Sequence, residues 1–413
     1  MHISGHLKLW TGIGLYILVS GAACGETRRE PSTGSTGGDP PVLSVASTNP
    51  ECRPIPVEGG GEGGEEGGGS LGLGSTRPAV VLAPEQQFQD RQILVDFADQ
   101  VVIPAYEQLA ADTQALSQAI QAFVKDPNPR TLEAARQAWS VARITWEESE
   151  AFAFGPAASL GLDANLDEWP LNEVEVLEVL ESGDPLAPGM VADLESGQKG
   201  FHAVAFLLFG VNNDKSLEDF TERDREYLAA VSSVLADTAE KLLKAWTEGV
   251  EGLPPFREEW VRAGEGSNSY LTLQAAAEEI AQGILGMLDE LGNVKIGEAF
   301  ARQNPFLLES RFAHHSLPEF QANVRSVQYA YLGGFRGRQG RGLSQFVRGI
   351  DPVLDDQIQL QFQEVAAALQ GIPAPMEKSL CDANARSSIT AAMEQIQRAF
   401  DGFSQGVVPL LQQ

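Results

Sequence analysis

The amino-acid sequence predicts an all-α protein built from two side-by-side helical bundles. From about residue 84 onward, apolar residues recur at the three- and four-residue spacing of amphipathic helices. We find no stretch of any length with the alternation of apolar and polar residues that is typical of a strand. Glycine and proline at residues 249–255 interrupt the pattern. We therefore predict an N-terminal bundle over residues 84–250 and a C-terminal bundle over residues 256–413.

The first 23 residues have the organisation of a secretion signal. Lys8 precedes an apolar run over residues 9–19, small residues occupy 20–23, and Cys24 follows directly. Small residues before a cysteine resemble the processing box of bacterial lipoproteins, in which that cysteine carries the lipid. We therefore expect an exported protein that a lipid on Cys24 anchors to a membrane, at the periplasmic face of the outer membrane or at the cell surface.

Residues 24–83 are predicted to be a disordered tether between the lipid and the folded body. Residues 59–69 consist only of glycine and glutamate. Such a composition buries too little apolar surface to offset the entropy lost on ordering. Cys52 in this stretch and Cys381 near the C-terminus can pair in an oxidising compartment. The sequence leaves open whether they do.

Within the predicted body, apolar periodicity and helix-breaking residues mark the helices. The first long helix is expected to bend near Pro104 and to end at the Asp-Pro-Asn-Pro sequence of residues 126–129. A second helix is expected from Thr131. Ser316 and Glu319 form a capping-box pattern that predicts the start of another. Further helices are expected at residues 173–180, 200–210, 224–246, 270–291, 355–369 and 384–403.

The most apolar of these segments, residues 200–210, carries a single titratable side chain, His202. A helix that is apolar on all sides is normally surrounded by protein, and this one is too short to span a bilayer. A lone histidine in such a helix is either a core residue or a ligand. Its spacing alone favours the core residue.

This segment resembles the signature helix of the imelysin-like family of exported bacterial proteins. The family pattern is Gly-x-His-x-x-Glu, followed by aliphatic and aromatic residues and a glycine. Gly200, His202 and Gly210 fit this pattern, whereas Ala205 stands where the family has glutamate. Histidine and glutamate three residues apart project to one side of a helix and can jointly hold a divalent metal. A methyl group cannot, so a metal site in this chain must draw a carboxylate from elsewhere.

Three other segments are similar to the family. Residues 139–156 resemble the stretch beside the histidine helix, residues 167–172 resemble an Asp-x-Trp-Pro element, and residues 308–320 resemble a Glu-Ser-x-Phe segment. The likeness covers about residues 85–405. It implies an all-α fold of two bundles with a ligand in the cleft between them.

The candidate site residues lie on these segments. We predict His202 as the metal contact at the centre of the site. Asp163 is a further acid beside the signature segments, which can equally be a solvated charge. The other predicted ligand-binding residues are Glu150, Asp167, Glu309, Arg311, His314 and His315.

Composition and motifs narrow the function. A net charge of −28 argues against nucleic acid as a partner; it suits a cation binder, and solubility alone explains it equally well. The sequence has no Gly-x-Ser-x-Gly elbow, no His-Glu-x-x-His and no Gly-Lys phosphate loop, so we predict no catalytic residue.

The resemblance implies a role in iron acquisition or, for one branch of the family, peptidase activity. We predict a lipid-anchored, non-catalytic protein that binds iron, zinc or haem and works with a membrane-bound iron-uptake partner. The alternatives are a metallopeptidase and an interaction protein that has lost its ligand site.

Overall fold

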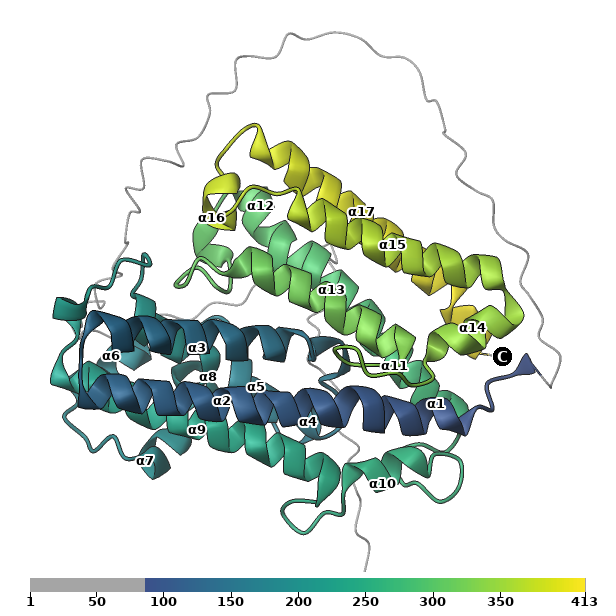
Figure 1. Ribbon diagram of the computed structural model, residues 1–413, viewed down its shortest axis with the longest axis horizontal. Helices are drawn as coiled ribbons and strands as arrows, with labels where there is room; N and C mark the ends of the chain where they lie inside the picture. Colours follow the sequence, from purple (N-terminus) through teal and green to yellow (C-terminus); the bar gives the residue numbers. More distant parts are fainter. Residues whose placement is uncertain (1–85, 413) are drawn as a thin grey trace, which may run out of the picture. The chain divides into compact units, whose positions relative to one another are not determined.

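The computed structural model describes residues 86–412 (Figure 1). The predicted signal peptide, the tether, Cys24 and Cys52 lie outside the described residues. Within residues 86–412 every regular element is a helix, which confirms the all-α prediction. None of these helices is both long enough and apolar enough to cross a membrane.

Four helices form the core of the first half of the body. Helix α2 packs against both α3 and α9, and α8 packs on α3 and α9. Figure 1 shows α2 and α9 running side by side, with α3 next to α2. The elements of this half are α1 (Arg91–Asp96), the π-helix η2 (Phe97–Val102), α2 (Ile103–Lys125), α3 (Pro129–Glu147), η3 (Glu150–Phe152), α4 (Pro156–Ser159), α5 (Leu162–Asp167), α6 (Glu173–Glu181), α7 (Pro188–Ala192), η4 (Ser196–Gln198), α8 (Gly200–Phe209), η5 (Leu217–Asp219) and α9 (Glu222–Thr247).

The second half is built on α11, α13, α15 and α17, which also pack against one another. Aromatic rings of Tyr331, Phe362 and Phe403 meet in its core, with centroids 5.8–6.2 Å apart. The elements of this half are α10 (Phe256–Val261), α11 (Leu273–Asp289), the π-helix η6 (Glu290–Glu298), α12 (Ala299–Arg302), η7 (Pro305–Leu307), α13 (Ser316–Leu332), α14 (Leu343–Ile350), α15 (Pro352–Gln370), α16 (Met376–Ser379), α17 (Ala385–Gly406) and α18 (Val408–Leu411).

Local chemistry explains where the helices begin. Asn128 caps α3 in a capping box with Thr131, and Pro129 occupies the first turn, so α3 starts two residues before the predicted Thr131. The capping box predicted at Ser316 is wrong. Ser316 is already the first residue of α13, and the Glu319 side chain turns into the protein interior. Pro104 is the second residue of α2 and follows the π-helix η2 directly, so the chain is helical on both sides of it. Its missing N–H removes one helical hydrogen bond, and the carbonyl oxygen of Gln100, four residues earlier, accepts from the N–H of Phe335 instead.

The two halves contact each other through α3 and α13 and through η3 and α11. The second contact is very close: a Cβ atom at Gly283 would lie 2.1 Å from the carbonyl oxygen of Ala151, so only glycine allows it. All described residues belong to one compact unit. The predicted boundary at residues 249–255 therefore remains a prediction.

The glycine-rich loop between α13 and α14 also joins the two halves. The N–H of Phe335 donates to the carbonyl oxygen of Gln100 in η2. Arg336 pairs with Glu148 at 2.7 Å and Arg341 pairs with Asp90 at 2.5 Å. The arginines of this loop thus bind acids of the first half.

Cys381 lies just after α16 and is disulfide-bonded. The chain has three cysteines, and the other two lie outside the described residues. The partner of Cys381 is therefore not among residues 86–412.

Candidate functional site

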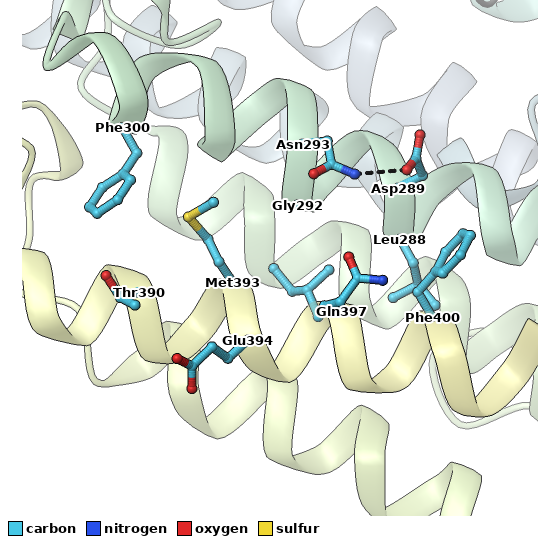
Figure 2. A pocket seen from close by; sticks show the side chains of 11 residues that line it. Leu288, Asp289, Gly292, Asn293, Phe300, Thr390, Met393, Glu394, Gln397 and Phe400 are labelled. Carbon is cyan, nitrogen blue, oxygen red and sulfur yellow. Dashed lines mark hydrogen bonds between the residues drawn. The ribbon is translucent and has the colours of Figure 1, made fainter. Parts of the chain in front are cut away.

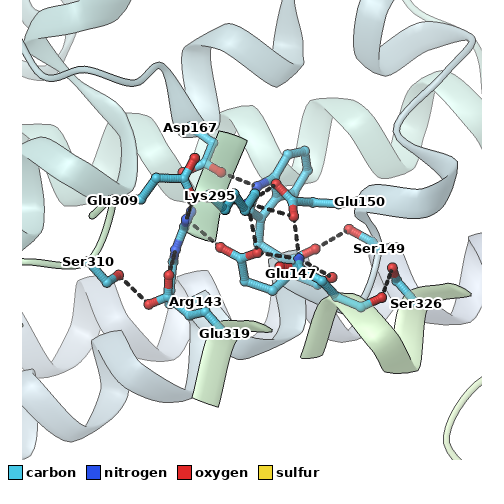
Figure 3. A network of polar contacts seen from close by, with 12 residues as sticks. Arg143, Glu147, Ser149, Glu150, Asp167, Lys295, Glu309, Ser310, Glu319 and Ser326 are labelled. Carbon is cyan, nitrogen blue, oxygen red and sulfur yellow. Dashed lines mark hydrogen bonds and ion pairs between the residues drawn. The ribbon is translucent and has the colours of Figure 1, made fainter. Parts of the chain in front are cut away.

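The contact between the halves contains a buried network of charged side chains (Figure 3). Its first centre is Arg143 of α3, which has no exposed surface. Its guanidinium pairs with Glu147 one helical turn further on and with Asp167 at the end of α5. Its Nε lies 3.2 Å from Glu319 of α13. Burial on its own lowers the pKa of Arg143, but the surrounding carboxylates, Asp167 foremost, raise it well above the usual value.

The second centre is Lys295 of η6. Its Nζ lies 3.2 Å from a carboxylate oxygen of Glu147 and 2.9 Å from one each of Glu150 and Glu309. The amide of Asn323 donates to Glu147 and Glu150. One ammonium group is thus surrounded by three carboxylates from two segments of the chain, residues 147–150 and Glu309.

The network holds more acids than cations. Among residues 86–412, five acids surround the two permanent cations Arg143 and Lys295, and two imidazoles adjoin them: Glu147, Glu150, Asp167, Glu309 and Glu319, with His202 and His315. This imbalance divides the acids into two groups by their pKa values.

The surroundings lower the pKa of two of these acids and raise the pKa of two others. For Glu147 and Asp167, burial is the largest single effect and raises the pKa, but Arg143 together with Lys295 at Glu147, and with His202 at Asp167, outweighs it and lowers the pKa. For Glu150, burial and then repulsion by Glu147 raise the pKa well above its usual value, and burial also raises that of Glu309. Glu150 and Glu309 therefore hold protons more tightly than ordinary glutamates.

His202 lies next to this network. Its side chain is 1% exposed, its Nε2 lies 3.0 Å from Oδ1 of Asp167, and its ring packs on Trp169 with centroids 4.8 Å apart. Nε2 is thus paired with the carboxylate of Asp167, whereas Nδ1 has no hydrogen-bond partner within residues 86–412. An imidazole and a carboxylate, both common metal ligands, are thus adjacent in the interior.

Gly200 makes this approach possible. Its φ is +78°, and a Cβ atom at this position would lie 2.4 Å from the carbonyl oxygen of Leu166. The start of α8 and the end of α5 therefore touch through a residue without a side chain, which brings Asp167 to His202. Trp146 of α3 donates from Nε1 to the other oxygen of Asp167 at 2.6 Å and orients the carboxylate.

The structure brings four of the predicted site residues into one place and sets the others around it. Glu150, Asp167 and Glu309 belong to the network, and His202 adjoins it. The remaining predicted residues and Asp163 lie at its edge or outside it.

His315 lies at the edge of the network, with Nδ1 3.1 Å from Glu319. Arg311 pairs with Glu173 and stacks on the ring of Phe312, 4.2 Å from its centroid, outside the network. His314 takes part in no ion pair of the network among the described residues, and burial followed by the charge of Lys378 lowers its pKa.

Asp163 of α5 keeps contact with solvent beside the network. Surrounding atoms nevertheless desolvate its carboxyl group, and Asp167 and Glu290 repel its charge. Together these effects raise the pKa of Asp163 to about 7. It is therefore an acid that exchanges its proton near neutral pH.

Sequence reasoning missed the residues that organise the network. Arg143 stands one helical turn after Trp139, so it lies on the buried stripe of its helix; this was the available signal. Lys295 had no such signal, because it lies in a π-helix whose residues do not follow the 3.6-residue period.

Two sets of acids have the proximity that a metal ion requires. Ligand oxygens of Glu147, Glu150 and Asp167 lie within 4.8 Å of one another, and so do those of Glu147, Glu309 and Glu319. In both sets the space between the oxygens borders on Lys295 or Arg143. The residue types fit a cation, and two tethered cationic groups already partly neutralise them.

Two cavities lie elsewhere. One of about 320 Å³ lies between the α11–η6 segment and α17 and is lined by apolar side chains with Asp289, Asn293 and Glu394 at its rim (Figure 2). Another of about 600 Å³ lies between the loop before α7 and α9. His202 and the network residues line neither of them. The predicted site is therefore a packed interior, and these two cavities are separate features.

Comparison with known proteins identifies the class of protein. Residues 102–401 match the imelysin family, peptidase family M75. The match covers most of the chain, so this chain belongs to the imelysin family, as its motifs predicted.

Among individual proteins, iron-regulated protein A of Synechococcus elongatus is 33% identical over 347 residues, which are 83% of this chain and 94% of that protein. Two solved structures share the fold. A Parabacteroides distasonis protein described as an iron-regulated protein A precursor has a TM-score of 0.71 at 24% identity, over 80% of this chain and 96% of its own. An imelysin-like protein of Psychrobacter arcticum has a TM-score of 0.62 at 16% identity, over 81% of this chain and 98% of its own.

Proposed function

We propose that this protein is an exported, lipid-anchored, non-catalytic component of iron uptake that binds a metal ion at the buried network beside His202. The observation that carries the proposal is the excess of buried carboxylates over cations, next to an imidazole whose Nε2 lies 3.0 Å from Asp167. The relative named iron-regulated protein A supports the link to iron.

The donor set suits iron. Carboxylate oxygen and imidazole nitrogen are the ligands of many non-haem iron sites, and the same ligands also bind zinc. Glu147, Glu150 and Asp167, whose ligand oxygens lie within 4.8 Å of one another, would hold the ion, with His202 next to Asp167 at 3.0 Å. Glu150 would supply the carboxylate that the family takes from the position of Ala205. A bare ion fits better than haem, because the site is packed and neither cavity described above reaches His202.

The metallopeptidase alternative is less well supported. A catalytic metal needs an open coordination position that substrate and water can reach. The side chain of His202 is only 1% exposed, and that of Asp167 is 7% exposed. The interaction-protein alternative predicts that the chain has no metal affinity. The calorimetric titration described below tests this alternative as well.

The anchor and the partner belong to the proposal as well. A lipid on Cys24 would hold the body near a membrane-bound iron-uptake partner, at the periplasmic face of the outer membrane or at the cell surface. The negative net charge of −28 would attract cations to the body.

Isothermal titration calorimetry of the full chain with Fe²⁺ under anaerobic conditions, and with Zn²⁺, tests this function. We expect one site per chain, and we expect His202→Ala and Asp167→Asn each to weaken binding by at least about tenfold. Affinity is expected to rise from pH 6 to pH 8, because the metal must displace the proton from Glu150, whose pKa is raised.

His314→Ala serves as the matched control, because His314 lies outside the network ion pairs. The His314→Ala variant is expected to bind the metal ion as tightly as the natural chain does. Absence of binding for both metals, or binding that His202→Ala leaves unchanged, would contradict the proposed function. A titration with haem, monitored by absorbance, tests whether the chain binds haem, the third predicted ligand.

A further inference from the structure

We propose that Trp169 determines which molecules reach His202, because its ring closes the imidazole off from bulk solvent. The ion pair between Glu173 and Arg311 holds this ring in place. Only a small ion that arrives through the neighbouring acids can then contact the imidazole. The inference rests on the proposed function for the identity of that ion, whereas the closure itself is a property of the fold.

His202 has an unpaired nitrogen and almost no exposed surface. Its Nε2 faces Asp167 at 3.0 Å, and its Nδ1 has no hydrogen-bond partner within residues 86–412. An imidazole nitrogen without a partner can bind a metal ion or react with an electrophile. The side chain is only 1% exposed, so the residues that cover it decide what can reach it.

Trp169 is the part of this cover that borders on solvent. Its ring packs on the imidazole of His202 with centroids 4.8 Å apart. Phe312 packs edge-on against Trp169 at 6.2 Å and against Phe206 at 5.5 Å. Phe206 and Phe312 are buried, whereas Trp169 is partly exposed. Outward rotation of this one indole would therefore uncover the imidazole.

Arg311 joins the two segments that supply these rings. Its guanidinium lies 4.2 Å from the centroid of Phe312 and 5.2 Å from that of Phe306. It also pairs with Glu173, four residues after Trp169. The side chain of Arg311 is 9% exposed and that of Glu173 is 35% exposed, so water competes for this ion pair and the pair can open. It is thus a clasp between the two segments.

The segment over residues 172–190, which follows the indole, is held by polar contacts rather than by apolar packing. Val176 is the one buried residue in it. Arg223 of α9 donates to the carbonyl oxygens of Val179 and Asp184. Segments with few buried apolar contacts open locally at a smaller free-energy cost than the core does. Opening beside the indole is therefore compatible with an intact core.

The acids of the network are covered less completely than the imidazole. The side chains of Glu150 and Glu309 are each 14% exposed, and that of Asp167 is 7% exposed. A small cation can therefore meet carboxylates first, whereas a bulky ligand that binds imidazole directly meets Trp169. This difference makes the indole a determinant of specificity for the site.

Carbethoxylation of His202 by diethyl pyrocarbonate, measured by peptide mass spectrometry on the metal-free full chain, tests the inference. A buried imidazole reacts only while it is uncovered, so the rate follows the open fraction. We expect Trp169→Ala to raise the rate at His202 at least about tenfold. Glu173→Gln should raise it about threefold, the scale of one partly exposed ion pair. Trp169→Phe keeps a ring in place and should restore most of the protection.

Three controls separate uncovering of the imidazole from general loosening of the fold. Glu251→Gln breaks a surface ion pair and should leave the rate at His202 unchanged. Phe362→Ala removes a buried ring from the core of the second half and should lower the melting temperature without raising that rate. In Trp169→Ala the rate at His315 should equal that of the natural chain, because this side chain is already 20% exposed.

The inference is overturned if a folded Trp169→Ala leaves the rate at His202 unchanged. It is also overturned if Glu173→Gln does so, and this variant keeps the test open should Trp169→Ala fail to fold. A natural chain in which His202 reacts as fast as His315 would overturn it as well.

The two proposals fail separately. If the chain binds neither Fe²⁺ nor Zn²⁺ but the rate at His202 rises as expected, the proposed function fails and the closure by Trp169 stands. If the chain binds metal and the substitutions leave the rate unchanged, the proposed function stands and the inference fails.

Discussion

Glu377 shows how burial of a single acid makes stability depend on pH. Burial raises its pKa to about 7 from 4.5, although hydrogen bonds oppose part of that effect. One of its oxygens has no hydrogen-bond partner among the described residues, and the other lies 3.4 Å from Ser316. The neutral form is therefore the one that the fold accommodates.

Replacing Glu377 by Gln is expected to stabilise the protein above neutral pH. Because the folded-state pKa is raised, the contribution of Glu377 is complete below about pH 4.5 and is lost as the pH rises through 7. Glutamine mimics the neutral acid, so the gain in unfolding free energy should reach about 3 kcal/mol at pH 8 and fall below about 1 kcal/mol at pH 5. Thermal melts at the two pH values measure it.

Glu394→Gln is the matched control for this substitution, since Glu394 is exposed and makes no hydrogen bond or ion pair within residues 86–412. Its melting temperature should follow that of the natural chain at both pH values. Equal shifts for both variants would show that net charge, rather than burial of Glu377, controls the pH dependence.

At the level of single residues, part of the site could be identified from the sequence. Glu150, Asp167 and Glu309 were predictable because they lie on segments that resemble the family motifs. Arg143 and Lys295 were not predicted, because a buried cation is recognisable only when its acids are known to surround it. Those acids are more than 140 residues away in the case of Lys295 and Glu147, and no local pattern shows that contact.

Among the helices, α8 depends on the glycine at its start. Gly200→Ala is expected to lower the unfolding free energy by about 3 kcal/mol or more. The added methyl group would lie 2.4 Å from the carbonyl oxygen of Leu166, at a φ of +78° that side chains rarely adopt. Urea denaturation followed by circular dichroism measures the change.

Gly286→Ala in α11 is the control for Gly200→Ala. A Cβ atom at Gly286 meets no atom within 4 Å, and the residue is helical, so alanine should leave stability unchanged or raise it by up to about 1 kcal/mol. A loss at Gly200 no larger than the effect at Gly286 would show that α5 and α8 can separate without cost.

The helices themselves were largely predictable from the sequence. The segment predicted at 355–369 is α15 (Pro352–Gln370), and the one predicted at 384–403 is α17 (Ala385–Gly406). Both are amphipathic, so their apolar stripe defines them. The two π-helices were not predicted, because an added residue per turn changes the period on which such reasoning depends.

For the whole molecule, the network makes the two halves dependent on each other. Arg143 and Glu147 come from the first half, whereas Lys295, Glu309 and Glu319 come from the second. A half expressed alone would leave these charges buried without partners or exposed to water. Breaking such a pair on one side typically costs about 3–5 kcal/mol.

We therefore expect the full chain to unfold in a single calorimetric transition, with calorimetric and van't Hoff enthalpies in agreement. Residues 256–413 expressed alone should lack a cooperative transition. Two resolved transitions in the full chain, or a separately folding C-terminal half, would show instead that the predicted boundary at residues 249–255 divides independent domains.

The charge network also constrains how this family can diverge. A mutation that removes Lys295 leaves Glu147, Glu150 and Glu309 to repel one another, and a mutation that removes one acid leaves a cation uncompensated. Inheritance should therefore preserve these residues as a set or exchange them together. A chain that loses the lysine is expected to remain folded only if it gives up an acid as well, so a change at Lys295 in the π-helix and a change at one of its acids are coupled.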